Sequence, residues 1–180
     1  MVQYRRNRIA GATYFFTVAI ADRGARLLVD HVDLLRQAVE HTRLARPFYV
    51  DAMVVLPDHL HAVWTLPEGD ADYAGRWSGI KAGFTHALSK SGMSLQSRRK
   101  GEFRVWQSRY WEHTVRDEDD LRHHVEYIWF NPVKHGHARR VEDWPHSSFH
   151  RAVREGIVTA DWGREVGDER GHGYGERPNP

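Results

Sequence analysis

Runs of apolar, β-branched and aromatic residues alternate with polar stretches along the chain, and this pattern predicts most of its secondary structure. Short apolar runs bounded by Gly, Pro or Asp are typical of β-strands. Pro57 and Asp58 separate two such runs, so we expect a tight turn and an antiparallel hairpin there. The predicted strands cover residues 14–20, 48–56, 59–66 and about 106–115.

Two segments between these strands have the apolar spacing of helices. The first begins after Asp30, a residue suited to a helix N-cap, and ends near Arg46, because Pro47 cannot continue it. The second covers residues 73–90. The Ser-, Gly- and Arg-rich segment 91–102 that follows is predicted to be a loop.

A third helix is predicted after the last strand. It begins in the acidic run 116–120, since acidic side chains are favourable in a first turn. We expect it to end at Asn131, because Pro132 disfavours helical geometry at the residue before it.

The order strand, helix, strand, strand, helix, strand, helix predicts an α+β fold, an antiparallel β-sheet with helices packed on its faces. With 180 residues, 41% of them hydrophobic, the chain suits one domain, which we expect over 1–163. The Gly-rich residues 164–180 are expected to form a disordered tail. No apolar run approaches the roughly 18 residues of a membrane helix, and the basic N-terminus lacks a secretory cleavage signal, so we expect a cytoplasmic location.

The sequence contains no cysteine, which excludes disulfides, thiolate metal sites and cysteine nucleophiles. The net charge is only +2, but the basic residues form clusters that suit a phosphate backbone. Seven Trp and seven Tyr side chains could stack on unpaired bases, so nucleic acid is the favoured partner. For any single cluster, a solvated surface remains an equally good explanation. The clusters are Arg5, Arg6 and Arg8; Arg98, Arg99 and Lys100; and Arg139 and Arg140.

His59 and His61 begin the predicted third strand. Side chains alternate along a strand, so both imidazoles lie on one face and can reach a single metal ion. In a chain with 13 histidines this spacing is a weak signal. Two strand histidines that are hydrogen-bonded at a solvent edge remain the alternative.

Tyr127 and Asn131 share a face of the third predicted helix, because they are four residues apart. Leu121, Val125 and Ile128 form an apolar stripe on that helix, and the pair lies about a quarter to a third of a turn from its centre. A tyrosine that only packs would more often lie on the stripe. The alternative for Asn131 is an asparagine that satisfies backbone groups at the helix end.

Two imidazoles, an amide oxygen and a phenol suit a metal-dependent transesterification of a phosphodiester. A metal held by His59, His61 and Asn131 would polarise the phosphate, and Tyr127 would attack it. A phenol has a pKa near 10, so a nearby cation must favour its ionised form. Glu112 and His113, on the preceding strand, could also approach the site, although the sequence gives no distance to it.

With these residues in place, the chain resembles the REP-associated tyrosine transposases, relatives of the single-tyrosine HUH transposases of small bacterial insertion sequences. The resemblance covers roughly residues 4–163 and implies a ferredoxin- or RRM-like HUH nuclease sandwich. Its specificity comes from the order and spacing of short segments. These are residues 4–6, 11–17, 56–61, 76–77, 80–81, 106–107, 111–113, 127–128, 131–136, 143–145 and 147–149.

The resemblance implies that His59 and His61 are metal ligands, Tyr127 the nucleophile and Asn131 the third ligand. Members of the family cut single-stranded DNA beside imperfect hairpins, form a 5′-phosphotyrosine link and use Mg²⁺ or Mn²⁺. We therefore expect an endonuclease and strand-transferase that acts at hairpins of repetitive extragenic palindromes. Asp58 stands where relatives commonly carry Asn, a difference in the hairpin turn that leaves the inferred ligands intact.

For DNA binding, the resemblance implies contacts from the N-terminal residues Arg5, Arg6 and Arg8, since basic side chains can bond phosphates and base edges. A disordered basic leader is the alternative. Arg76 and Lys81 on the second helix are available for DNA or for solvent.

Two hypotheses about function remain open. One is the metal-dependent nuclease, and the other is a catalytically idle regulator or architectural protein that binds DNA hairpins. Single-stranded or hairpin DNA is the partner in both, which predicts association with the nucleoid. Insertion-sequence relatives are dimers whose tyrosine helix serves the neighbouring subunit, whereas the group resembled here acts as monomers. A monomer is therefore favoured and a dimer stays open.

Overall fold

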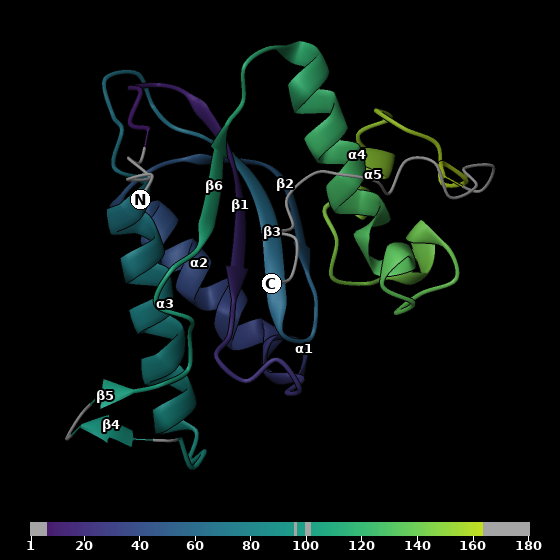
Figure 1. Ribbon diagram of the computed structural model, residues 1–180. Helices are drawn as coiled ribbons and strands as arrows, with labels where there is room; N and C mark the ends of the chain where they lie inside the picture. The colour runs from purple at the N-terminus through teal and green to yellow at the C-terminus, as the bar shows by residue number, and fades with distance from the viewer. Residues whose placement is uncertain (1–6, 96, 100–101, 164–180) are drawn as a thin grey trace, which may run out of the picture.

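The computed structural model describes residues 7–95, 97–99 and 102–163 (Figure 1). Its centre is a four-stranded antiparallel sheet in the order β2-β3-β1-β6. The predicted α+β class and the β2-β3 hairpin are confirmed. The strands are β1 (Thr13–Ala19), β2 (Tyr49–Val55), β3 (His59–Thr65) and β6 (Trp111–Thr114). The predicted tail 164–180 lies outside the described residues.

Two helices cover one face of the sheet, α2 (Val32–Ala45) and α3 (Tyr73–Lys90), and they pack against each other (Figure 1). Alternate β1 side chains, Phe16 among them, point into this layer. The ring of Trp64 on β3 stacks on that of Trp77 on α3, with centroids 4.1 Å apart. These aromatic contacts form the larger of two apolar cores.

Helix α4 (Glu118–Lys134) crosses the opposite face over β2 and β3 (Figure 1). Phe15, Val54 and Val63 point toward it and form the second core with Ile128. The sheet is thus covered by helices on both faces, as the sequence predicts. Because α4 carries Tyr127 and Asn131, and β3 carries the two histidines, this face holds every residue of the predicted site.

The chain after α4 forms two further elements that the sequence pattern does not predict. They are a short 3-10 helix, η1 (Val141–Asp143), and helix α5 (Phe149–Arg154), whose Phe149 is buried in the second core. Residues 146–148 run along the outer edge of β2, where Val55 N donates to the carbonyl of His146 at 2.9 Å. This segment covers the edge of the sheet.

The start of the first predicted helix is wrong. Asp30 does not cap α2 but ends a separate short helix, α1 (Leu27–Asp30), and His31 precedes α2 without a capping bond from its side chain. The cause is tertiary, because Leu28 is buried and its N–H donates to the carbonyl of Pro57 at 3.0 Å.

The segment predicted as a loop, 91–102, contains strand β4 (Ser97–Arg99), which pairs with β5 (Glu102–Phe103). The strand expected over 106–115 is shorter than predicted. Trp106 makes only an isolated bridge to Ile20 before the chain leaves the sheet and returns as β6.

Helix α4 passes through Pro132 and ends at Lys134, so the predicted end at Asn131 is wrong. Proline lacks an N–H and loses one helical bond. The neighbouring bonds persist, because Asn131 O accepts from His135 N at 3.0 Å and Pro132 O accepts from His137 N at 2.8 Å. Pro132 is also buried, which compensates for the lost bond. Within the described residues, no helix has the length and apolar character needed to cross a membrane.

Candidate metal and tyrosine site

His59 and His61 lie at the start of β3, opposite Ala19 and Thr17 of β1. Their side chains are buried, with 5% and 0% of their surface exposed. Their ring centroids are 5.0 Å apart. The alternative of two histidines at a solvent edge therefore does not apply.

Each of these histidines has one ring nitrogen engaged by a neighbouring side chain. His59 Nδ1 lies 2.7 Å from Asp58 Oδ1, and Asp58 Oδ2 lies 2.7 Å from Arg23 Nε. His61 Nδ1 lies 2.9 Å from Thr17 Oγ1. Burial raises the pKa of Asp58, but its bond to His59 and the nearby charges outweigh this and lower it below the usual value. The ionised Asp58 accepts the Nδ1 proton of His59, which leaves Nε2 as the nitrogen with a lone pair available to a ligand.

Tyr127 and Asn131 lie one turn apart on α4, where they are 5% and 0% exposed. The Tyr127 ring lies 5.2 Å from that of His61, centroid to centroid, at an interplanar angle of 73°. The predicted stripe does pack, with Ile128 buried in the second core and the half-buried Leu121 and Val125 against it, but the packed face is wider than predicted. The pair lies on the packed face of α4, so burial alone does not distinguish a functional tyrosine from a structural one.

Two buried polar atoms, His61 Nε2 and Asn131 Oδ1, are of the kinds that bind a divalent metal. Among the described residues, neither His61 Nε2 nor the amide atoms of Asn131 have a hydrogen-bond partner, although all are fully buried. Leaving buried polar atoms unpaired costs about 1–3 kcal/mol each. Burial, followed by the charges of His59, His135 and Lys134, holds the pKa of His61 well below its ordinary value. The imidazole is thus neutral, the form that binds metals.

The last turn of α4 brings two more groups to the site. Lys134 Nζ lies 5.1 Å from the centroid of the Tyr127 ring. The ring of His135 lies 5.6 Å from that of His59. Sequence reasoning missed both, although Lys134 is seven residues after Tyr127 and three after Asn131, a spacing that predicts a shared helix face.

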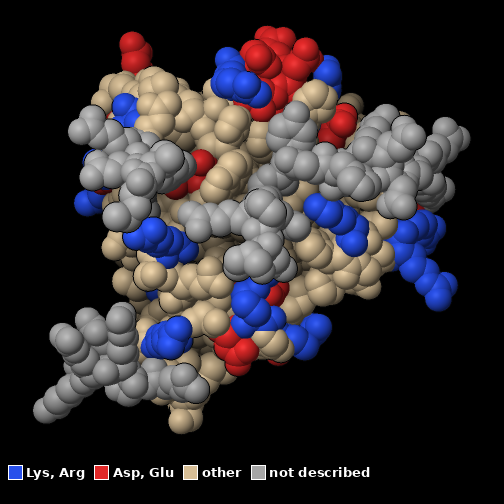
Figure 2. All heavy atoms as spheres, viewed as in Figure 1, with Lys and Arg blue, Asp and Glu red and all other residues tan. Residues whose placement is uncertain are grey.

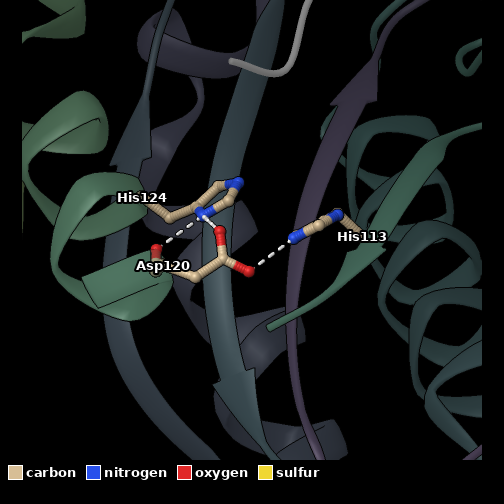
Figure 3. Close-up of side chains that lie close together, drawn as sticks. All are labelled: His113, Asp120 and His124. Carbon is tan, nitrogen blue, oxygen red and sulfur yellow. Dashed lines mark hydrogen bonds and ion pairs between the residues drawn. The ribbon is translucent and has the colours of Figure 1, made fainter. Parts of the chain in front are cut away.

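A second cluster joins β6 to the start of α4 (Figure 3). His113, Asp120 and His124 bring ligand atoms within 4.8 Å of one another and could hold a divalent metal. His113 Nε2 lies 2.8 Å from Asp120 Oδ2, which also accepts from Arg116 N at 3.0 Å. His124 Nδ1 lies 2.8 Å from the carbonyl of Asp120 and 3.2 Å from its Oδ1.

These bonds favour a structural role over a metal centre. We call His113, Asp120 and His124 the clamp, because their hydrogen bonds connect β6 to α4. A carbonyl only accepts, so Nδ1 of His124 carries a proton and is not a free ligand. Burial raises the pKa of Asp120, but hydrogen bonds from His113 and Arg116 more than offset this and lower it to about 2. The carboxylate is therefore ionised and saturated by donors. The cluster ties the first turn of α4 to the sheet.

Arg76 takes a structural position. Its guanidinium is 1% exposed and donates to the carbonyls of Arg46, Pro47 and Asp72 and to the carboxylate of Asp70. The Asp70 bond is 2.7 Å. A DNA contact would break this network, so the DNA-binding role predicted for Arg76 does not fit.

Lys81 is also engaged within the fold, since its Nζ donates to the carbonyl of Gln107 at 3.1 Å and lies 5.2 Å from the ring centroid of Tyr110. Arg8 is exposed, whereas Arg5 and Arg6 lie outside the described residues. Of the three predicted DNA contacts that the structure describes, Arg8 is thus the one that is exposed and not engaged as Arg76 and Lys81 are.

Charge along α4 is polarised. Acidic side chains gather at its first turn, and Figure 2 shows them as a group at the top of the molecule. The last turn carries Lys134, followed by His135. Arg122 and Arg116 pair with two of the three acids at the first end, whereas the second end, beside the histidines, presents a cation that attracts a phosphate.

Comparisons with known proteins identify relatives of this chain. The chain matches no protein-family model. It is 46% identical to the Escherichia coli K12 REP-associated tyrosine transposase over 168 residues, 93% of this chain and 94% of that protein. A Haemophilus influenzae protein, provisionally named as a member of the same family, is 43% identical over 165 residues, 91% of this chain and 94% of its own.

A solved structure gives the same result. It is described as the REP-associated tyrosine transposase bound to a REP hairpin, and it is 44% identical to this chain. The two superpose with a TM-score of 0.85, and the match covers 100% of each chain. By sequence and by fold, this chain belongs to the REP-associated tyrosine transposase family.

Proposed function

We propose that this chain is a metal-dependent endonuclease and strand-transferase that cuts single-stranded DNA at hairpins of repetitive extragenic palindromes. The observation that carries the proposal is the contact of the Tyr127 phenol with buried His61, whose Nε2 has no hydrogen-bond partner in the described residues. A nucleophile next to an unsatisfied ligand atom is the arrangement that metal-assisted phosphoryl transfer requires.

The proposed substrate follows from the relatives. The solved structure that matches the full length of this chain is described as bound to a REP hairpin. Hairpin DNA is thus the first substrate to test, and the basic end of α4 suits its phosphates.

His59, His61 and Asn131 would hold Mg²⁺ or Mn²⁺, and the ion would supply positive charge to the scissile phosphate. Asp58 and Thr17 fix the two imidazoles with Nε2 available. Because strand and helix backbones hold these side chains, the site is organised before DNA arrives.

Tyr127 performs the covalent step. Its phenolic oxygen is buried in this structure, so the proton passes to water that enters with the bound DNA as the oxygen attacks phosphorus. A bond forms between the tyrosine oxygen and phosphorus, the bond from phosphorus to the 3′ oxygen breaks, and that oxygen takes a proton to become a free 3′-OH. The 5′ side of the cut stays linked to Tyr127. Attack by a 3′-OH on this link reverses the reaction and restores the phenol, so strands can be rejoined without ATP.

The geometry supports a monomer as the active unit. The His61 and Tyr127 rings are in contact within one chain, so the nucleophile and the ligands need no second subunit. We accordingly propose that residues 1–163 act as one domain with its site in cis.

Tyr127→Phe tests the proposal. We expect the purified variant to bind a labelled REP hairpin but to form no covalent protein–DNA adduct with Mn²⁺ or Mg²⁺ on a denaturing gel. The matched control is Tyr49→Phe, because Tyr49 is 68% exposed at the start of β2 and should react like the unmodified chain. Cleavage by the Tyr127→Phe variant would refute the nucleophile. Binding without any adduct by the unmodified chain would favour the idle hairpin-binding regulator.

A further inference from the structure

Lys134 is a charged group at the site to which the proposed reaction has so far given no role. It lies in the last turn of α4, on the face that carries Tyr127 and Asn131. Its side chain is exposed, and its Nζ lies 5.1 Å from the centroid of the Tyr127 ring. This side chain is thus at the surface, with its ammonium over the ring of the proposed nucleophile.

We propose that Lys134 is a catalytic residue that binds a non-bridging oxygen of the scissile phosphate and holds that phosphate against Tyr127. The inference rests on the proposed function. It names Lys134 as the protein side chain that binds the scissile phosphate directly. It also predicts which DNA phosphate Lys134 touches, namely the one that is cut.

Distance supports this assignment. An attacking oxygen stands roughly 3–3.5 Å from the atom that it attacks. A phosphate placed for attack by Tyr127 therefore lies close to the edge of the phenol ring. The flexible lysine stem holds its ammonium over the face of this ring, 5.1 Å from the centroid, so a change of side-chain rotamer toward the ring edge would bring it to the phosphate.

Charge supports it as well. The attacking oxygen and the phosphate both carry negative charge as the bond forms, and a cation between them lowers their repulsion. Lys134 is suited to this position because cations are favourable at a helix C-terminus. The opposite end of α4 carries three acidic residues, of which Asp119 and Asp120 are paired with Arg122 and Arg116, so it offers a phosphate no comparable cation.

The competing explanation is structural, because a lysine in a last turn can stabilise a helix with no contact to DNA. The two roles give different results. A structural lysine changes thermal stability and affects all DNA ligands equally, whereas a phosphate contact couples to one phosphate and is recovered in part by arginine.

The first measurement is the rate of adduct formation at saturating hairpin. We expect Lys134→Gln to slow it by roughly 100-fold, the usual effect of removing one donor to a transition state, and Lys134→Arg to restore most of it. The control is Lys90→Gln, because Lys90 is also exposed in a last turn, that of α3. It should leave the rate unchanged.

The second measurement does not depend on activity. The affinity for hairpin DNA is measured without divalent metal for the unmodified chain and Lys134→Gln, on DNA in which single phosphates are replaced by neutral methylphosphonates. We expect one replacement, at the cleavage position, to weaken binding and to lower the salt dependence by about one ion. In Lys134→Gln the same replacement should not weaken binding further. The effects of the two changes on affinity are then not additive, which shows in a double-mutant cycle that Lys134 and this phosphate interact.

The outcomes separate the two proposals. An unmodified chain that forms no adduct refutes the proposed function, while the methylphosphonate scan still shows whether Lys134 contacts one particular phosphate. Coupling to a phosphate other than the one cut, or no coupling, overturns the assignment of Lys134. An unchanged adduct rate in Lys134→Gln overturns it too.

Discussion

His113 Nε2 on β6 lies 2.8 Å from Asp120 Oδ2 in the first turn of α4, and this bond ties the tyrosine-bearing helix to the edge of the sheet. Asp120 also accepts from Arg116 and His124. The ring of Phe15 packs against those of His124, Tyr127 and His61, with centroids 4.6, 5.9 and 5.5 Å away. The clamp and the candidate metal site therefore share one packed layer.

Asp120 should make stability depend on pH in the acidic range. Its folded pKa of about 2 is below the ordinary 3.8, so the stabilisation is fully present above about pH 4 and is lost as pH falls toward 2. This shift corresponds to about 2 kcal/mol. We expect urea unfolding of Asp120→Asn to show a lower free energy at pH 6 and a flatter acid dependence than the unmodified chain.

Asp119→Asn is the matched control for that experiment. Asp119 is the preceding residue, 73% exposed, and pairs only at the surface with Arg122, so its loss should change the free energy of unfolding by less than about 1 kcal/mol. Equal effects of the two substitutions would contradict the clamp.

The residues that orient the histidines should control metal affinity. Asp58→Ala and Thr17→Val remove the partners of His59 and His61, and we expect each to weaken Mn²⁺ binding by roughly 10–100-fold in calorimetry. Asp58→Asn keeps a side-chain oxygen that can accept from Nδ1 and should lose less.

The same titration distinguishes the two candidate metal sites. If Mn²⁺ instead binds at His113, Asp120 and His124, Asp120→Asn will abolish binding and Asp58→Ala will not. The exposed Asp33, which is paired only with Arg36 on α2, provides the control Asp33→Ala.

Much of the fold could be predicted from the sequence because the signals are local. Alternation marks the hairpin that places His59 and His61, and helical spacing puts Tyr127 and Asn131 on one face. Tertiary contacts decide the features that the sequence could not give. Burial of Leu28 separates α1 from α2, and bonds beyond Pro132 let α4 continue.

The site follows the same division. His59 and Tyr127 could be chosen from motifs, but the partner of His113 depends on how β6 lies against α4, and no local pattern contains that distance. For Arg76 the sequence pattern is misleading. A basic residue on a helix suggests a DNA contact, but this side chain is buried and bound to Asp70.

Arg76→Ala should reduce stability and leave the salt dependence of hairpin binding unchanged. Removing one partner of a buried charged network typically costs about 3–5 kcal/mol, because the remaining groups lose their bonds. Chemical denaturation checks the first expectation, and binding by the folded fraction checks the second. A lower salt dependence with unchanged stability would instead return Arg76 to the DNA interface.

A site in cis makes a further prediction for mixed variants. His61→Ala lacks a proposed ligand and Tyr127→Phe lacks the proposed nucleophile, so neither should form an adduct alone. If Tyr127 serves the histidines of its own chain, as their 5.2 Å ring contact indicates, the mixture should also form none. If α4 instead serves a neighbouring subunit, mixed dimers would contain one complete site and the adduct would appear. Tags of different size on the two variants would then show that the chain linked to DNA is the one that retains Tyr127. Sedimentation of the unmodified chain with hairpin DNA gives the number of subunits in the active complex.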